Sequence, residues 1–543
     1  MSWWDNPREF LEKCTRIPLE REAAELAKKI TLHHRVQGSV GLEKAVKEIA
    51  ELLENSGLEV KLFEIPSNSS RGFIETPVSW DAEEGFLEIK VGDSRLAEFN
   101  YALHPTLISA HSPPSEGCSE LKVCENVFEC DGEAVLVEAP AYVAYKEISA
   151  RLVVLYDSKK HRSAVPYTGL FIRGDEVKNT TVVNVPYETA LRVMSMFGKG
   201  VKVDVCWGIK ATYNPLRPLY GLLAYHGEDP GALYVSHVCH PKPGAHDNAS
   251  GVVANILTAR ILKYCEKISH AHLFVPEYTG TVYASKYLPW IPTCVLNLDM
   301  VGSNQCITGS TLNIVNAPLF TRSITPPYVY LAAKMVLDTV NSFGGFNVPA
   351  SRYSLVPYTA GSDHDVTTMW GLDSSMLNEW PSKFYHTDMD DINSLSPPRL
   401  VDTAVIAALA GNMATRSYKG EQVVSSFKEY IKSWYALQAL KVGLDSSRLS
   451  RVLDEQISLS SKFEHTPISL RYIYRRLGAR KYLELRGIKG AHTFLSVYAP
   501  LAYLNGYSDN PLETFQLENI LQWSAREKHT VEEAWRVVRE ELG

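Results

Sequence analysis

The sequence lacks several features that would place it in a specialised class of protein. It has no Cys-x-x-Cys pair, no glycine-rich phosphate-binding loop, no apparent internal repeat and no low-complexity tract. No basic segment followed by an apolar one occurs at its start, so we expect no secretory signal. The longest uncharged run, Gly490 to Ser508, contains His492, Pro500 and Gly506, which favours core and turn over a membrane span. We therefore expect no membrane partner.

Strong charge of either sign is also absent. The 543 residues carry a formal net charge of −7, with 45% hydrophobic and 22% charged residues, as in ordinary globular proteins. A slightly acidic chain is a poor match for a phosphate backbone, so we expect no nucleic-acid partner. Nine scattered cysteines, an odd number, indicate reduced thiols rather than a disulfide framework. A cytoplasmic location follows as the expectation.

What the chain does contain is an alternation of helical and strand-like patterns. Residues 42–55 place apolar side chains on one helical face, and residues 60–63 then alternate as a strand does. Residues 233–235 and 272–275 are short apolar runs, and residues 252–262 between them have the period of a helix that lies on a sheet. Alternating strands and helices predict an α/β fold with a largely parallel sheet.

The apolar runs end in residues that bind cations or move protons. His237 and His240 follow the first run, Glu277 follows the second, and Asp299 closes a third at 294–299. Open α/β sheets bind ligands beyond the carboxyl ends of their strands, so these side chains are expected to converge on one rim. Each has an ordinary explanation alone, such as a histidine hydrogen-bonded in a core or a glutamate in a solvated loop. Together they favour a metal site.

Six motifs, taken in chain order, resemble those of the M28-type zinc aminopeptidases. They are His237, Asp247 to Gly251, Glu277, Asn297 to Met300, Ser362 to His364, and Tyr385 to Thr387. The resemblance covers roughly residues 1–70 and 215–415. It implies the zinc-peptidase fold, a mixed sheet flanked by helices, and the removal of N-terminal residues from peptide substrates with a free N-terminus.

The resemblance also implies a role for each matched residue. Asp247 would bridge two metal ions, with His237 and Asp299 completing one of them and His386 serving the other. Glu277 would activate the attacking water and pass its proton to the leaving amine. The implied cofactor is Zn²⁺, one or two ions per chain, with Co²⁺ or Mn²⁺ as alternatives.

The chain departs from the family pattern at two positions. Tyr278 stands where a second metal-binding carboxylate is expected, and Cys239 replaces an aspartate that orients the first histidine. His240 could compensate, as a ligand or as a group that orients one, and Glu379 could supply a ligand or hold the substrate's α-ammonium group. The remaining candidates for a supporting or substrate-binding role are Asp363 and His364.

Two other functions stay open at this point. The same chemistry would serve an amidohydrolase or deacylase that acts on a small non-peptide amide. A metal-binding scaffold with a degenerate site would explain the departures at Tyr278 and Cys239. A requirement for a free α-amine separates the first alternative from an aminopeptidase, and the effect of Glu277→Gln on turnover separates the second.

Three domains are expected from the change of pattern along the chain. Residues 1–70 and 212–415 would form the catalytic domain, and residues 71–211 a β-rich insert similar to protease-associated (PA) domains. The insert would act as a lid over the metal cleft or as a packing module. Residues 416–543 would form a helical, winged-helix-like C-terminal domain.

Mixed charges in the C-terminal domain favour packing or dimerisation over DNA binding, and a homo-oligomer is compatible with this tail. An apolar stripe from Val423 to Leu437 is expected to lie in the core. Thr530 and Glu533 are expected to form the capping box of the last helix.

Overall fold

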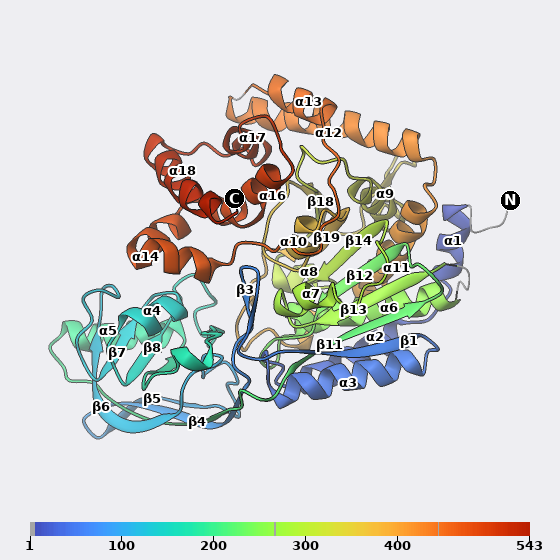
Figure 1. Ribbon diagram of the computed structural model, residues 1–543. Coiled ribbons are helices and arrows are strands. Elements are labelled where there is room, and N and C mark those ends of the chain that lie inside the picture. The colour runs from blue at the N-terminus through green and yellow to red at the C-terminus, as the bar shows by residue number, and fades with distance from the viewer. Residues whose placement is uncertain (1–5, 265–267, 444, 543) are drawn as a thin grey trace.

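The computed structural model describes residues 6–264, 268–443 and 445–542 (Figure 1). An eight-stranded sheet has the strand order β1-β11-β13-β12-β14-β19-β15-β18, and a seven-stranded sheet has the order β5-β4-β10-β6-β7-β8-β9. The two sheets lie side by side, and the C-terminal helices sit above both in Figure 1. The predicted mixed α/β fold with flanking helices is confirmed.

The eight-stranded sheet is parallel at its centre. Its strands are β1 (Glu59–Ile65), β11 (Leu219–His226), β12 (Ala232–His237), β13 (His270–Val275), β14 (Cys294–Asp299), β15 (Thr311–Val315), β18 (Tyr353–Val356) and β19 (Ser374–Trp380). Strand β12 pairs in parallel with β13 and β14, and β14 pairs in parallel with β19. Every residue of β12, β13 and β14 is buried, as expected for strands covered on both faces. Their carboxyl ends therefore meet at one edge.

Helices cover both faces of this sheet because alternate residues of each strand point to opposite sides. On one side Tyr234 of β12 enters a core shared with α2 (Glu20–Thr31), α3 (Val40–Glu54), α6 (Ser250–Tyr264), α9 (Thr325–Leu337) and α11 (Pro397–Thr415). On the other side Leu233 and Val235 pack with α7 (Thr279–Ala284) and α10 (His364–Met369). Short elements nearby are α1 (Pro7–Cys14), α8 (Gln305–Thr308), η3 (Ala245–Ala249), η4 (Ile392–Ser394), β16 (Val340–Asn341) and β17 (Asn347–Val348).

The seven-stranded sheet occupies the segment between β3 and β11. Its elements are β4 (Trp80–Val91), β5 (Ser94–Asn100), β6 (Ser115–Val123), β7 (Ala134–Val137), α4 (Ala141–Glu147), β8 (Leu152–Leu155), η2 (Gly174–Glu176), β9 (Thr181–Asn184), α5 (Tyr187–Gly198) and β10 (Asp204–Tyr213). A two-residue hairpin, β2 (Ser70–Arg71) and β3 (Ile74–Glu75), leads into it. Strands β6 to β9 are parallel, whereas β10 pairs antiparallel with β4 and β6. We call residues 71–211 the insert below.

Four cysteines of the insert form disulfides, so the prediction of reduced thiols is wrong for them. Cys118 of β6 lies opposite Cys206 of β10, with their Cα atoms 4.1 Å apart, and Cys124 is joined to Cys130. Residues separated by 88 positions become neighbours only through strand pairing, which their spacing does not reveal. The expectation of a cytoplasmic location therefore loses the support of fully reduced cysteines, and it stays a prediction.

The C-terminal segment is helical. It comprises α12 (Gly420–Val442), α13 (Ser447–Asp454), α14 (Leu470–Gly487), α15 (Ala491–Thr493), η5 (Phe494–Tyr498), α16 (Ala499–Leu504), α17 (Pro511–Glu518) and α18 (Ala525–Glu540). Within the described ranges, no helix combines the length and the apolar character that crossing a membrane requires.

Two expectations for this segment are wrong in detail. The capping box of α18 is formed by Ser524 and Glu527, while Thr530 lies inside the helix and donates its hydroxyl proton to Glu484. The apolar stripe of α12 is only partly core, because Leu437 is 67% exposed although Ile431 is buried. A helical period shows which residues share a face, but not how much of that face is covered.

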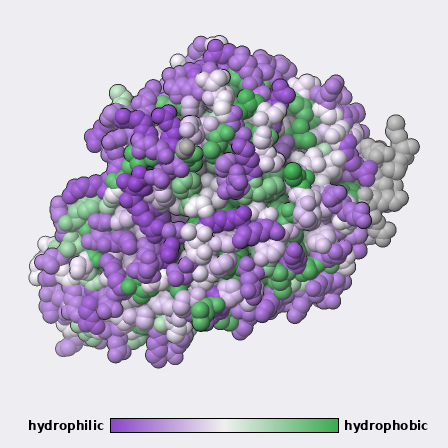
Figure 2. Space-filling view, in the orientation of Figure 1, coloured by the Kyte–Doolittle hydropathy of each residue, from purple (hydrophilic) through white to green (hydrophobic). Residues whose placement is uncertain are grey.

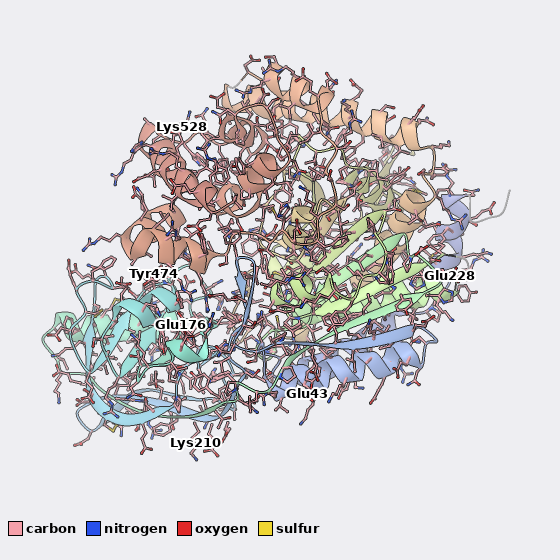
Figure 3. All side chains as sticks on the ribbon, in the orientation of Figure 1. Glu43, Glu176, Lys210, Glu228, Tyr474 and Lys528 are labelled. Atoms are coloured by element: carbon pink, nitrogen blue, oxygen red, sulfur yellow. A yellow bond between two sulfur atoms is a disulfide. The ribbon has the colours of Figure 1, made fainter. Side chains whose placement is uncertain are left out.

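Helix α14 packs against the insert through charged and aromatic contacts. Arg475 lies 3.2 Å from Glu176, and Glu176 also accepts hydrogen bonds from the Tyr142 hydroxyl at 2.6 Å and the Lys146 ammonium at 3.1 Å. Tyr474 donates a hydrogen bond to Glu147. Figure 3 shows Glu176 and Tyr474 on the two sides of this contact. The C-terminal helices therefore pack directly against the insert.

Candidate metal centre

The segment after β12 is shaped by Asn248. Its side-chain oxygen accepts the amide protons of Gly251 at 3.0 Å and Met300 at 2.9 Å. Its side-chain nitrogen donates to the carbonyls of His237 at 3.3 Å and Leu298 at 3.1 Å. One amide thus joins the ends of β12 and β14 to the first turn of α6, and the neighbouring Asp247 is placed at the sheet edge.

Asp247 is shared by two groups of side chains that could hold metal ions. The first group is His237, Asp247 and Asp299, and the second is His240, Asp247 and His386. Oδ1 of Asp247 lies 3.4 Å from His237 Nε2, which is itself 3.3 Å from Asp299 Oδ1. Oδ2 of Asp247 lies 3.0 Å from His386 Nε2 and 3.5 Å from His240 Nε2. Each carboxylate oxygen therefore faces one group.

Backbone carbonyls fix the orientation of two of these imidazoles. His237 Nδ1 lies 3.1 Å from the carbonyl oxygen of Cys239, and His240 Nδ1 lies 2.8 Å from that of Pro241. A proton donated from Nδ1 leaves a lone pair on Nε2, the atom that faces Asp247. The carbonyl of Cys239 thus takes the place of the aspartate that the family pattern puts at this position. The thiol of Cys239 instead accepts the amide proton of Glu277 at 3.1 Å.

Asp390 supports Asp247, although the sequence motifs do not include it. Its two carboxylate oxygens accept the amide protons of His246 and Asp247, both at 2.9 Å. Burial raises the pKa of Asp390 to about 6, despite these amides and the nearby His240. Its position four residues after His386, in a loop of three aspartates, was the signal available.

Arg35 is a second supporting residue that sequence patterns missed. Its guanidinium is fully buried and donates to the carbonyls of Val238 at 2.8 Å and Gly244 at 2.9 Å. Its backbone exchanges two hydrogen bonds with His240, at 2.9 and 3.0 Å. The loop from residue 238 to residue 244 is therefore fixed at both ends. All these acceptors are main-chain atoms, which leave no trace in a sequence.

Tyr278 belongs to neither ligand group, and its polar atoms bind other aspartates. Its hydroxyl donates to Asp365 Oδ2 at 2.6 Å, and its amide donates to Asp363 Oδ1 at 2.8 Å. Glu277, one residue earlier, lines the same pocket as His237. Burial raises the pKa of the Glu277 carboxyl well above its usual value, and the negative charges of nearby aspartates act in the same direction.

The other predicted residues lie around this centre without joining either ligand group. Glu379 is buried and accepts hydrogen bonds from the Ser303 amide at 3.0 Å and the Ser310 hydroxyl at 3.1 Å. His364 Nε2 lies 2.9 Å from the carbonyl of Thr359. Asp363 accepts hydrogen bonds from Tyr278 and Thr281. Glu379 is absent from the residues that line the pocket beside the ligands.

A small pocket of about 140 Å³ adjoins the two ligand groups. Its walls come from three parts of the chain: Val36 and Gln37, residues 167–171 of the insert, and the ligand-bearing loops. The Tyr167 ring lies 4.7 Å from the ring of His240 and 4.8 Å from that of His386. The amide of Tyr167 donates to the carbonyl of His386 at 2.7 Å. The insert therefore closes one side of the pocket.

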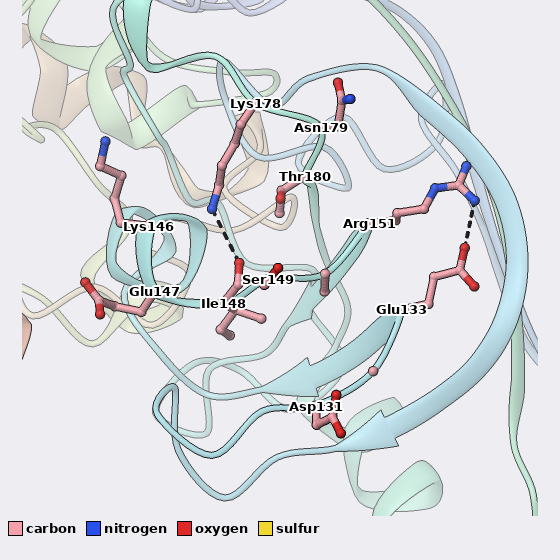
Figure 4. Close-up of a pocket in the computed structure, with 12 residues that line it drawn as sticks. Asp131, Glu133, Lys146, Glu147, Ile148, Ser149, Arg151, Lys178, Asn179 and Thr180 are labelled. Carbon is pink, nitrogen blue, oxygen red and sulfur yellow. Dashed lines mark hydrogen bonds and ion pairs between the residues drawn. The ribbon is translucent and has the colours of Figure 1, made fainter.

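A larger cleft of about 550 Å³ lies within the insert itself (Figure 4). It sits at the amino ends of β7, β8 and β9 and is lined by charged groups, including the Arg151 and Glu133 ion pair. Parallel strands bind ligands at their carboxyl ends, the opposite edge. Neither of the two metal-ligand groups found among the described residues lies in this cleft. The pocket at Asp247 is the better candidate.

A carboxylate shared by two sets of imidazole and carboxylate donors, at the carboxyl edge of an α/β sheet, is typical of a metal-dependent hydrolase. Residues 225–410 match the model of Peptidase family M28. The chain is thus a hydrolase of the metallopeptidase class. Comparison with curated proteins gave no match.

Solved structures show the same fold at low sequence identity. One is a Peptidase M28 precursor from Shewanella amazonensis SB2B, with 13% identity and a TM-score of 0.57 over 76% of this chain and 96% of that one. Another is a zinc aminopeptidase from Bacillus subtilis, with 20% identity and a TM-score of 0.50 over 72% of this chain and 94% of that one. The recognition of an M28-type peptidase from six short motifs is confirmed.

Proposed function

We propose that the protein is an aminopeptidase that uses Zn²⁺ at the centre around Asp247. The observation that carries the proposal is the division of the Asp247 carboxylate between two donor groups, with Glu277 in the adjoining pocket. Peptide substrates with a free N-terminus are the proposed partners. The PA-like character of the insert and the expected domain limits are part of the same proposal.

The donor atoms fit Zn²⁺, which takes imidazole nitrogen and carboxylate oxygen ligands. His237, Asp247, Asp299 and His386 would hold the ions. Two of the imidazoles in the centre already present a bare Nε2, because their Nδ1 atoms are occupied by carbonyls. When bound, such ions polarise the scissile carbonyl and lower the pKa of water.

Glu277 is the residue proposed to move the proton. Its carboxyl lies in the pocket beside His237, and a raised pKa gives it a high affinity for a proton taken from water. The same group then returns the proton to the departing amine. The hydrogen bond from the Glu277 amide to the thiol of Cys239 fixes the backbone that carries this carboxyl.

The size of the pocket supports attack at the end of a peptide. A volume of about 140 Å³ is small beside the roughly 300 to 1,000 Å³ of sites for drug-sized ligands. Tyr167 of the insert and Gln37 of the N-terminal segment limit it on two sides. A closed space of this size receives one terminal residue rather than the middle of a chain. A small non-peptide amide would also fit and is the second candidate.

The test compares aminoacyl chromogenic amides with their N-acetylated counterparts, before and after chelation. We expect chelator-sensitive cleavage of the free amines only. Glu277→Gln should lower kcat by about 100-fold to 10,000-fold, the range of general acid and base catalysis, with unchanged metal content. Equal cleavage of the acetylated substrates would favour the amidohydrolase, and bound metal without any cleavage would favour the scaffold.

A further inference from the structure

Without His240, the second ligand group would have one donor fewer than the first. Asp247 and His386 contribute one atom each, and the residue expected to supply a carboxylate is Tyr278. Its hydroxyl donates a hydrogen bond to Asp365 at 2.6 Å, and Asp365 belongs to neither ligand group. Tyr278 therefore leaves the place of a third ligand open to another side chain.

His240 has an unused nitrogen that faces this place. Its side chain is buried, and its Nε2 has no hydrogen-bond partner within the described part of the chain. This atom lies 3.5 Å from Oδ2 of Asp247, the same oxygen that faces His386. A buried polar atom without a partner destabilises the fold, so its presence requires an explanation.

The orientation of His240 is set by groups outside the ligand set. Its Nδ1 is engaged by the carbonyl of Pro241 at 2.8 Å, which leaves the lone pair on Nε2. Its backbone is paired with Arg35, whose guanidinium is anchored to two further carbonyls of the same loop. Metal-binding histidines are commonly oriented in this way, with the second nitrogen bound to a carbonyl.

We propose that His240 is the third protein ligand of a second metal ion, which it holds together with Asp247 and His386 in place of the carboxylate that Tyr278 lacks. This inference rests on the proposed function only in that it assumes a metal at the Asp247 centre. It assigns a ligand to the second site, for which this chain lacks the carboxylate of the family pattern.

The proposal makes the two sites chemically unequal. The first has two carboxylates and one imidazole, whereas the second has two imidazoles and one carboxylate. Carboxylates suit Mn²⁺ and Mg²⁺, and imidazoles suit Zn²⁺ and other later transition metals. We therefore expect the second site to prefer Zn²⁺ over Mn²⁺ more strongly than the first does.

Titration of the chelator-stripped, full-length chain with Zn²⁺ tests the ligand set directly. Calorimetry and elemental analysis after desalting should give two ions for the unmodified chain and one for His240→Ala. Because loss of a group that merely orients a ligand weakens binding by about 10- to 100-fold, loss of the ligand should cost at least about 100-fold at one site. The matched control is His364→Ala, a buried histidine beside the centre but outside both groups, which should keep two ions.

A carboxylate variant keeps the test decisive if His240→Ala does not fold. His240→Glu supplies a carboxylate in place of the imidazole, so the variant should still bind two ions. Its second site should prefer Zn²⁺ over Mn²⁺ less strongly than the second site of the unmodified chain. Mn²⁺ occupancy is followed by electron paramagnetic resonance in competition with Zn²⁺. An unaltered preference in His240→Glu would count against the ligand role.

Two outcomes overturn the proposal: a single ion in the unmodified chain, or two ions with unchanged affinities in His240→Ala. Failure of the proposed function looks different. A protein that binds two ions through His240 but cleaves no aminoacyl amide would keep the ligand assignment and lose the aminopeptidase. A protein that binds one ion and cleaves these amides would keep the aminopeptidase assignment and lose the ligand assignment.

Discussion

At the residue scale, Asp247 connects the two ligand groups. Hydrogen bonds of Asp390 and Asn248 position its backbone. Asp390 accepts its backbone proton at 2.9 Å, and Asn248 fixes the next residue to the ends of two strands. The backbone that carries the Asp247 carboxylate is therefore held in place by protein groups alone. Such preorganisation reduces the cost of assembling a site on binding.

Replacement of Asp247 by Asn should remove both ions together. The amide keeps the shape of the side chain but offers one weakly basic oxygen instead of two charged ones. We expect metal content after desalting to fall from two ions to none, with at least a 100-fold loss of affinity. Asp391→Asn, which changes only an exposed cap of η4, is the control and should retain both ions.

Tyr278→Phe should affect stability but not metal content. The variant removes a hydroxyl that donates to Asp365 at 2.6 Å, and Asp365 is fully buried. Loss of one partner of a buried hydrogen bond costs about 1–3 kcal/mol of the free energy of unfolding. Denaturant titration and elemental analysis give the two readouts. A change in metal stoichiometry would contradict our description of Tyr278.

Some residues of the centre could be predicted from the sequence and others could not. His237, Glu277 and Asp299 were predicted to share a rim because each ends an apolar run, and the structure brings them to one edge. The direction of Tyr278 depends on a distant aspartate. The role of Arg35 depends on main-chain carbonyls, which have no sequence signature.

The element that links the insert to the centre is the pairing of residues 165–167 with residues 386–388. The amide of Val165 donates to Asp388 Oδ1 at 2.9 Å, and the other carboxylate oxygen lies 2.7 Å from Nδ1 of His104. Pro166 forms an isolated bridge with Thr387. The loop that presents His386 is therefore fastened to the insert.

Asp388→Ala should loosen this contact. Two hydrogen bonds are lost, each with a net contribution of about 0.5–1.5 kcal/mol, so we expect the affinity of the ion held by His386 to fall by about tenfold. KM for aminoacyl amides should rise, because the same contact forms one wall of the pocket. Zn²⁺ titration and steady-state kinetics measure the two effects, and an unchanged affinity would show that His386 is positioned independently of the insert.

At the scale of elements, periodicity predicted helices that bury one face and leave the other exposed. Helix α3 was expected at 42–55 and spans Val40–Glu54. Periodicity could not show which residues of a helical face are covered by another element. Leu437 was assigned to the same apolar stripe as Ile431, yet nothing within the described part of the chain covers most of it. The capping box of α18 was misplaced because Thr530 and Ser524 both precede a glutamate by three residues.

For the whole molecule, the contact of the C-terminal helices with the segment that follows β15 includes a buried carboxyl. Glu518 of α17 accepts the Tyr498 hydroxyl proton at 2.7 Å and the Leu319 amide proton at 3.1 Å. Burial raises the pKa of Glu518 to about 7. The folded protein binds this proton more tightly than the unfolded chain, so the associated stability is complete below about pH 4.5 and is lost as the pH rises through 7.

Glu518→Gln should remove this pH dependence. The amide keeps an acceptor oxygen for both donors and carries no charge to bury. Melting temperatures at pH 5 and pH 8 should fall closer together in the variant, with a gain of the order of 3 kcal/mol at most at the higher pH. An equal fall in melting temperature at both pH values would mean that Glu518 acts only through its hydrogen bonds.

The disulfide between β6 and β10 should stabilise the insert. It closes a loop of 88 residues, for which a cost of about 2–4 kcal/mol on removal is typical. Cys118→Ser together with Cys206→Ser should lower the melting temperature of the insert and should make it sensitive to proteases. The exposed cysteine Cys306 provides the control, because Cys306→Ser touches no disulfide.

The exterior has no large continuous apolar area on the face shown in Figure 2, where hydrophilic residues predominate and hydrophobic ones are scattered. Net charge and composition could predict this property. The joining of three separate stretches of chain around one pocket could not be predicted, since it depends on how the insert sits against the loop after β19.

If both proposed sites were filled, the sharing of one carboxylate would also imply a thermodynamic linkage between the two cations. Two dications that share the oxygens of Asp247 repel each other, so occupation of one site should weaken binding at the other by the same factor in both directions. A Zn²⁺ titration should then show two separate inflections rather than one. Loss of His240 should leave a single inflection. At limiting metal supply the unmodified protein would exist mainly in a singly loaded form.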